Sequence, residues 1–215
     1  MTRKTPWDMT IREFAERAGS SKATPGGGST SALAAALGSA MTSMAASLSH
    51  RERTPDQIEH IEAAELEMKE VSAECERLMS EDMRSFAEYL KANEAAETEE
   101  DEALIRAAHK TIEVPLSLME VCIRGLKSAR GIAEATREHV LSDLGVGIVM
   151  FEAAARSAYL TVRINLPACG DAGKREAYGD RADVLLLQAE RLRELALNEV
   201  TRAIERAAEK EAGGS

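Results

Sequence analysis

The 215-residue sequence predicts an all-α protein that forms a single-domain bundle of six or seven helices. Aromatic residues make up 3% of the chain and hydrophobic residues 44%, so the core must consist mainly of Ala, Leu, Met, Ile and Val. Ala, Leu, Met and Glu favour helices, whereas sheets prefer aromatic and β-branched residues, which excludes a predominantly β fold. We assign residues 1–210 to this domain and expect residues 211–215 to be a disordered tail.

The N-terminal part of the chain predicts two helices separated by a break. A short helix is expected over residues 11–18, because Thr10 and Glu13 form a capping-box pattern at its start. Residues 20–28 contain a proline and three consecutive glycines, which interrupt the helical pattern. A second helix is expected over residues 29–49, where large side chains recur every three or four positions among alanines. Since such a helix can be approached closely from several directions, we expect it to be central and buried.

The remainder of the chain predicts longer helices. They are expected over residues 56–90, 103–130, 142–165 and 180–208, with a solvated acidic stretch at 93–102 and a loop at 166–178. Pro115 should bend or break the second of these helices, because proline cannot donate the helical hydrogen bond. Ser142 resembles an N-cap for the third.

The charge balance limits the partners of this protein. With 27 basic and 37 acidic side chains the net charge is −10, which argues against binding to nucleic acids or anionic membranes. No apolar run is long enough to span a bilayer, and the N-terminus lacks the apolar core of a signal peptide. The three cysteines lie far apart without metal-ligand spacing, and their odd number fits a reducing compartment. We therefore expect a soluble cytoplasmic protein without a metal site.

Asp82 interrupts an apolar seam in the long helix that begins near residue 56. Ile61, Met68 and Cys75 occupy one position of a seven-residue pattern, and Asp82 occupies the next equivalent position. Burying a charge without partners is costly, so this carboxylate should have specific hydrogen bonds or line a cavity. The alternative is a purely structural role, in which it caps a neighbouring helix or pairs with an arginine.

Two helix starts could bind a ligand. Residues 24–29, Thr-Pro-Gly-Gly-Gly-Ser, would offer backbone N–H groups to a carboxylate, a phosphate or a polar ring edge, although a simple turn is the alternative. The segment is neither a P-loop nor a dinucleotide site, because no Gly-Lys-Ser/Thr follows and no strand precedes it. Ser142 and Asp143 form a second, acidic helix start, for which a capping role is the alternative.

Four stretches of the sequence carry a resemblance to a known family. They are TPGGGSTSALAAALGSAMTSM (24–44), EDMRSFAEYL (81–90), EVPLSLMEVC (113–122) and SDLGVGIVMFEAAARSAYLTVRIN (142–165). In this order they resemble the cyclodeaminase/cyclohydrolase family, which includes the C-terminal half of formiminotransferase-cyclodeaminase and the free-standing methenyltetrahydrofolate cyclohydrolases. The chain resembles a divergent member of this family, since it lacks the usual Leu-Pro-Lys segment near Lys91 and has Thr161 in place of the first asparagine of an Asn-Val-x-x-Asn motif.

The resemblance implies a homodimeric, all-helical enzyme of one-carbon metabolism that takes a tetrahydrofolate derivative as its substrate and holds no cofactor tightly. The expected reaction is the hydrolysis of 5,10-methenyltetrahydrofolate to 10-formyltetrahydrofolate. The alternatives are a lyase, formimidoyltetrahydrofolate cyclodeaminase, which releases ammonia, and a non-catalytic folate-binding or dimeric interaction protein.

The same resemblance gives the glycine-rich segment and the two acidic positions a functional role. We expect Asp82 to be the catalytic proton-transfer carboxylate, with a pKa raised by its apolar neighbours, and Asp143 to assist it. The expected substrate-binding residues are Thr24, Pro25, Gly26, Gly27, Gly28, Ser29, Lys91, Ser142 and Asn165.

Overall fold

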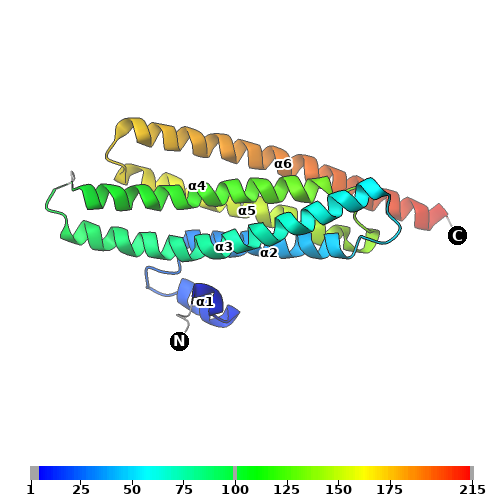
Figure 1. The fold of residues 1–215 in the computed structure, drawn as a ribbon, viewed down its shortest axis with the longest axis horizontal. Coiled ribbons are helices and arrows are strands. Elements are labelled where there is room, and N and C mark those ends of the chain that lie inside the picture. Colours follow the sequence, from blue (N-terminus) through cyan, green and yellow to red (C-terminus); the bar gives the residue numbers. More distant parts are fainter. Residues whose placement is uncertain (1–4, 99–100, 214–215) are drawn as a thin grey trace.

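The computed structural model describes residues 5–98 and 101–213, and these residues form six α-helices without a β-strand (Figure 1). The helices are α1 (Ile11–Ala18), α2 (Gly27–Ser47), α3 (Pro55–Ala95), α4 (Glu102–Gly131), α5 (Leu141–Asn165) and α6 (Ala172–Gly213). The prediction of an all-α bundle with six or seven helices is confirmed. None of the helices in the described part of the chain has a segment long and apolar enough to cross a membrane.

The helices α2 to α6 lie side by side along the long axis of the molecule (Figure 1). Each of α2 and α4 packs against both α3 and α5, and α6 covers α4 and α5. The small-residue helix α2 is central as predicted, because Ala32, Ala35 and Ala45 are fully buried in it. These alanines let α3 and α5 approach its backbone closely.

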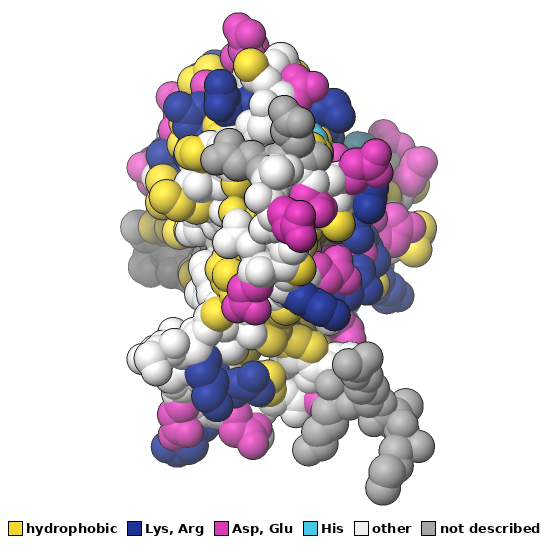
Figure 2. Space-filling model, turned by 90° about the vertical axis from the view of Figure 1, so that its left-hand side faces the viewer, with side chains coloured by type: hydrophobic (Ala, Val, Ile, Leu, Met, Phe, Trp, Pro, Cys, Tyr) yellow, Lys and Arg dark blue, Asp and Glu magenta, His cyan; other side chains and the backbone are white. Residues whose placement is uncertain are grey.

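The short helix α1 lies outside the bundle, on the side of α3 (Figure 1). Its predicted capping box is confirmed: the amide of Glu13 donates to Thr10 Oγ1 at 3.2 Å, and the amide of Thr10 donates to Glu13 Oε2 at 2.8 Å. Figure 2 looks onto the left-hand end of Figure 1, where hydrophobic side chains are exposed between the bundle and a smaller lobe below it. A cavity of about 460 Å³ separates residues 5–17 from Met83 of α3.

Several helix ends differ from the sequence prediction, and α3, for example, runs to Ala95 rather than to residue 90. The helix α2 begins at Gly27 rather than Ser29, so two of the glycines form its first turn and Gly26 is its N-cap. The start of α5 is Leu141, with Val140 as its N-cap, so the prediction that Ser142 is the N-cap is wrong. The predicted loop over 166–178 is also wrong beyond residue 171, since α6 begins at Ala172.

The early start of α6 has a local cause, although Gly170 and Gly173 on either side of it are typical of a loop. The side chain of Asp171 accepts a hydrogen bond from the amide of Lys174 at 2.9 Å, which satisfies one of the free N–H groups of the first turn. The helix continues to Gly213, beyond the predicted end at Ala208. It thus takes in residues 211–213 of the expected tail, and residues 214–215 lie outside the described range.

The sequence predicted that Pro115 bends or breaks its helix, and the break is wrong, because α4 runs through Pro115 from Glu102 to Gly131. Pro115 cannot donate to the carbonyl of Thr111, four residues earlier. That carbonyl instead accepts a hydrogen bond from the side chain of Asn165 in α5, with Nδ2 and O 2.8 Å apart. A tertiary contact therefore replaces the missing helical bond, and packing of the buried Pro115 ring keeps the helix continuous.

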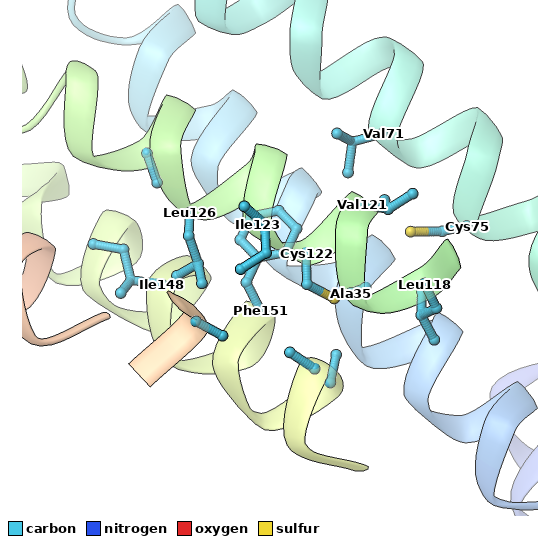
Figure 3. Close-up of a cluster of buried hydrophobic side chains, with 14 of the residues drawn as sticks. Ala35, Val71, Cys75, Leu118, Val121, Cys122, Ile123, Leu126, Ile148 and Phe151 are labelled. Carbon is cyan, nitrogen blue, oxygen red and sulfur yellow. The ribbon is translucent and has the colours of Figure 1, made fainter. Parts of the chain in front are cut away.

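The centre of the core is the ring of Phe151 in α5, which lies among side chains of α2, α4 and α5 (Figure 3). Gly125 of α4 faces this ring so closely that a Cβ atom at residue 125 would overlap it. At the last residue of α4, Gly131, a Cβ atom would meet nothing within 4 Å. The two glycines therefore differ in packing although both belong to one helix.

We predict that Gly125→Ala lowers the free energy of unfolding by about 1–3 kcal/mol, because the added methyl group overpacks the core against Phe151. Gly131→Ala is the matched control and should leave this free energy unchanged or raise it by up to about 1 kcal/mol, since alanine favours the helix. Urea unfolding followed by circular dichroism measures both. Equal effects of the two substitutions would contradict the packing argument.

Candidate active site

A second cavity of about 460 Å³ lies where α2 begins and α5 ends. This volume falls within the range of small-molecule binding pockets. The lining residues come from the segment before α2 and from α2, α3, α4 and α5: Ala23, Thr24, Gly26, Gly27, Gly28, Asp82, Ser85, Phe86, Thr111, Ser157, Leu160, Thr161, Ile164 and Asn165. Asp82 is the one acidic or basic side chain among these residues, all of which belong to the described part of the chain.

The carboxylate of Asp82 is held at the first turn of α2. Its Oδ2 atom accepts a hydrogen bond from the Ser29 hydroxyl at 2.7 Å, and the amide of Ser29 also donates to the carboxylate. Burial raises the pKa of Asp82 above its ordinary value of 3.8, while both hydrogen bonds oppose that rise by favouring the charged form. The expectation that Asp82 has specific hydrogen bonds or lines a cavity holds in both respects. The helix-capping alternative describes the same contact.

The close approach of Asp82 to α2 depends on Gly28. A Cβ atom at residue 28 would overlap Asp82 Oδ1, so no other residue fits here without moving the carboxylate. A Cβ atom at Gly27 would lie 3.7 Å from Thr161 Oγ1, which is an ordinary contact. The partial positive charge at the helix N-terminus favours a carboxylate at this place.

The wall formed by α5 presents three polar side chains spaced one helical turn apart. Ser157 Oγ donates to the carbonyl of Ala153 at 2.7 Å, and Thr161 Oγ1 donates to the carbonyl of Ser157 at 3.3 Å. Because these hydroxyl hydrogens are used within the helix, the hydroxyl oxygens face a ligand as acceptors. Asn165, the third of these residues, donates to α4 through Nδ2. The wall therefore suits a ligand that carries N–H or O–H donors.

The structure brings most of the predicted site residues together. Those that line the cavity are Thr24, Gly26, Gly27, Gly28, Asp82 and Asn165. Ser29 lies directly behind Asp82 as its hydrogen-bond partner, whereas Pro25 is buried and does not line the cavity. The glycine-rich segment thus acts as a carboxylate-holding helix start, in addition to forming a turn.

Three predicted site residues lie elsewhere in the chain. Ser142 and Asp143 stand in the first turn of α5, and Asp143 is 22 residues from Asn165 in one continuous helix, or about 33 Å. Lys91 is exposed on α3, about 14 Å along the helix from Asp82. The length of α5 is the reason that the two acidic positions do not meet within one subunit.

Sequence reasoning missed several lining residues. Ser85 and Phe86 follow Asp82 by one helical turn and so share its face, and Ser157 precedes Asn165 by two turns. This helical spacing from Asp82 and Asn165 could have identified these three residues as lining residues. Thr111, Leu160 and Ile164 have no such signal, because only the packing of α4 on α5 and the open end of the bundle bring them to the cavity.

No group of three His, Cys, Asp or Glu side chains within residues 5–98 and 101–213 could hold a metal ion. The three cysteines are buried and unpaired. The chemical groups that the cavity offers are the carboxylate of Asp82, the backbone N–H groups at the start of α2, and the polar side chains of α5.

Comparisons with known proteins place these features in context. Residues 10–184 match the family model described as formiminotransferase-cyclodeaminase. The chain is 30% identical over 192 residues to formimidoyltransferase-cyclodeaminase from Rattus norvegicus. The aligned region makes up 85% of this chain and 35% of that protein. It therefore spans about a third of the length of that relative.

Two shorter proteins, one similar in sequence and one similar in structure, are covered almost completely. Methenyltetrahydrofolate cyclohydrolase from Methylorubrum extorquens is 30% identical over 198 residues, which amount to 86% of this chain and 92% of that protein. The crystal structure of formiminotetrahydrofolate cyclodeaminase from Thermotoga maritima has the same fold, with a TM-score of 0.80 and 22% identity. The superposition covers 94% of this chain and 98% of that one.

We predict that Gly28→Ala lowers the free energy of unfolding by about 1–3 kcal/mol, because the methyl group must push Asp82 away from Ser29. Gly27→Ala is the matched control and should change this free energy by less than about 0.5 kcal/mol. Guanidinium unfolding of both variants checks the prediction. A tolerated Gly28→Ala would show that the carboxylate does not depend on this contact.

Proposed function

The chain belongs to the formiminotransferase-cyclodeaminase family, as its four motif stretches indicated, and we propose that it hydrolyses 5,10-methenyltetrahydrofolate to 10-formyltetrahydrofolate. The observation that carries the proposal is the position of Asp82, a carboxylate with a raised pKa in a cavity of suitable volume. Coverage of nearly the whole length of a relative named as this cyclohydrolase supports it further.

In the proposed reaction, a water molecule attacks the carbon that bridges two nitrogens of the reduced folate. Ionised Asp82 takes a proton from this water as the carbon–oxygen bond forms. One carbon–nitrogen bond of the tetrahedral adduct then breaks, the departing nitrogen takes the proton from Asp82, and the adduct hydroxyl releases its own proton to become a formyl oxygen. The N–H groups at the start of α2 would stabilise negative charge that develops on that oxygen.

Cyclodeamination is the second candidate, favoured by relatives and a structural neighbour named for it. In that reaction a folate nitrogen attacks the formimino carbon and ammonia leaves, and the same carboxylate would move the protons. A third candidate is a folate-binding or dimeric interaction protein without catalysis. The substitution of threonine at position 161, which lines the cavity, motivates this reading.

Other parts of the proposal concern the surroundings of the enzyme. We propose that the folate is a substrate rather than a tightly bound cofactor, and that Lys91, outside the cavity, binds the carboxylates of the folate glutamate tail. We also propose a cytoplasmic location, which the three unpaired cysteines support.

Absorbance of 5,10-methenyltetrahydrofolate with and without the protein tests the function, in a buffer where spontaneous hydrolysis is slow. Protein-dependent loss of the chromophore is expected. Ammonia release from formimidoyltetrahydrofolate, without hydrolysis of the methenyl form, would identify the cyclodeaminase instead. Binding of both folates without turnover would favour the non-catalytic alternative.

We predict that Asp82→Asn lowers kcat by at least about 100-fold, because the amide cannot accept a proton from water. In the wild-type enzyme, kcat/KM should fall as pH falls through a pKa above 3.8, since protonation removes the base. This acidic limb should be absent in the variant. Glu81→Gln, which removes the neighbouring half-buried charge that pairs with Arg77 outside the cavity, is the control and should stay within about twofold of wild type.

A homodimer through α2 and α5 is the final part of the proposal. The helix α2 contains no charged residue, yet Leu37 and Met44 are 47% and 43% exposed on it. On α5, an exposed stripe that includes Val149, Leu160 and Ile164 runs up to the rim of the cavity. Such a continuous apolar face is unusual for a surface that stays in water. A second copy is the matching partner, since the uncharged, apolar surface of α2 can pair with the same surface of another copy about a two-fold axis.

The dimer would also explain how Asp143 can act in the same site as Asp82. If the two copies of α5 run antiparallel across the two-fold axis, the first turn of one lies beside the last turn of the other. The partner subunit's Asp143 would then reach the cavity that contains Asp82. This arrangement gives both expected carboxylates a place in one site, in spite of the length of α5.

We predict that Leu37→Glu converts the dimer into monomers and removes turnover, because it places charges in the apolar face. Leu66→Glu, on the exposed side of α3, is the matched control and should keep both the dimer and its activity. Light scattering measures the mass, and the absorbance assay measures turnover. A wild-type monomer, or an active Leu37→Glu monomer, would exclude a site shared between subunits.

A further inference from the structure

A proline in α4 and an asparagine at the end of α5 meet at one backbone carbonyl, that of Thr111. Pro115 leaves this carbonyl without its helical donor, and Asn165 Nδ2 donates to it at 2.8 Å. We propose that Pro115 is a positioning residue, which keeps the Thr111 carbonyl free so that it fixes the side-chain amide of Asn165 in the cavity. The proposal rests on the proposed function for the identity of the ligand.

The contact determines which way the amide of Asn165 faces. A carbonyl oxygen only accepts hydrogen bonds, so the NH₂ group and not the oxygen of Asn165 must point at Thr111. Because the amide is planar, Oδ1 is then fixed as well. Asn165 lines the cavity, so this oxygen becomes an oriented acceptor for a ligand.

The neighbouring hydroxyl of Thr111 does not replace Asn165 as the donor to the Thr111 carbonyl. The hydroxyl of Thr111 donates to the carbonyl of Ala108 at 2.8 Å, so it serves a different acceptor. With an N–H group at residue 115, the Thr111 carbonyl would share its acceptor capacity between a helical hydrogen bond and Asn165, which would weaken the contact that orients the amide.

The fixed oxygen joins a set of acceptors on the cavity wall. The carboxylate of Asp82 and the hydroxyl oxygens of Ser157 and Thr161 are the others. Their common chemistry selects a ligand rich in N–H donors. The amino and amide N–H groups of a reduced pterin ring have this character, so we assign Oδ1 of Asn165 to one of these groups.

A thermodynamic cycle tests the contact without reference to activity. Pro115→Ala supplies a new N–H group, and Asn165→Ala removes the present donor. We expect Pro115→Ala to raise Tm more in the Asn165→Ala background than in wild type, because only there does the carbonyl lack a donor. Equal shifts in the two backgrounds would overturn the proposal.

Pro55→Ala is the matched control for this cycle. Pro55 is the first residue of α3, where an N–H group has no acceptor within the helix. Its shift in Tm should therefore be the same in both backgrounds. A background-dependent shift at Pro55 equal to that at Pro115 would show that the coupling is not specific to Thr111.

Steady-state kinetics tests the consequence for the ligand. Pro115→Ala should raise the KM for 5,10-methenyltetrahydrofolate about three- to tenfold with kcat within about twofold, and Asn165→Ala should do the same. The double variant should show no further rise, because both changes affect one interaction. An unchanged KM in Pro115→Ala, or additive effects, would overturn the proposed positioning.

Two further experiments distinguish a failure of the proposed function from a failure of the proposed role of Pro115. If wild type does not turn over any folate, the proposed function is wrong, while the cycle of Tm values still decides the contact. If Pro115→Ala does not fold, Asn165→Asp provides the test, since its carboxylate cannot donate to Thr111. The same rise in KM is expected for it, and an unchanged KM would overturn the proposal.

Discussion

The contact between Asp82 and the first turn of α2 is the constraint on which the rest of the site depends. It ties α3 to α2 through the hydroxyl and amide of Ser29, and it requires a residue without a side chain at position 28. The carboxylate gains hydrogen bonds and a favourable helix end, but it loses hydration. Its pKa is raised because burial outweighs these gains. One local arrangement thus provides both a structural link and a candidate acid–base group.

Small residues make this arrangement possible in the neighbouring helices as well. A Cβ atom at Gly38 of α2 would lie 3.0 Å from the carbonyl oxygen of Gly147 in α5, so the two backbones cross in close contact. Gly125 in α4 makes room for the ring of Phe151 in the same way. Because glycine and alanine replace large side chains at these crossings, α5 lies close enough to α2 for its last turns to form a wall of the cavity.

The helix α5 combines two roles along its length. One side of its last turns presents acceptors to the cavity, and its exposed stripe is apolar up to the cavity rim. A site and an unpartnered face are therefore continuous. This continuity connects the proposed chemistry to the proposed dimer, since a second copy on that face would also limit access of water to the ligand.

The helical class, the capping box of α1 and the unusual positions of Asp82 and the glycine-rich segment could all be recognised from the amino-acid sequence alone. Each of these depends on short-range patterns: composition, a three-residue capping spacing, a seven-residue seam and a run of glycines. Gly28 could be singled out as part of that run, but its contact with Asp82 joins residues 54 positions apart. A single sequence contains no signal for such a distance.

How these segments meet depends on contacts between helices, which local sequence patterns do not specify. The tertiary structure kept α4 continuous through Pro115, because Asn165 supplies a donor from another helix. It started α6 at Ala172 in spite of flanking glycines, because Asp171 caps the first turn. It also put Asp82 and Asn165 at one end of the bundle and Asp143 at the other, since a continuous helix of fixed rise per residue sets that separation. Local propensity acts on neighbours in the chain, whereas these outcomes depend on packing between helices that are distant in the sequence.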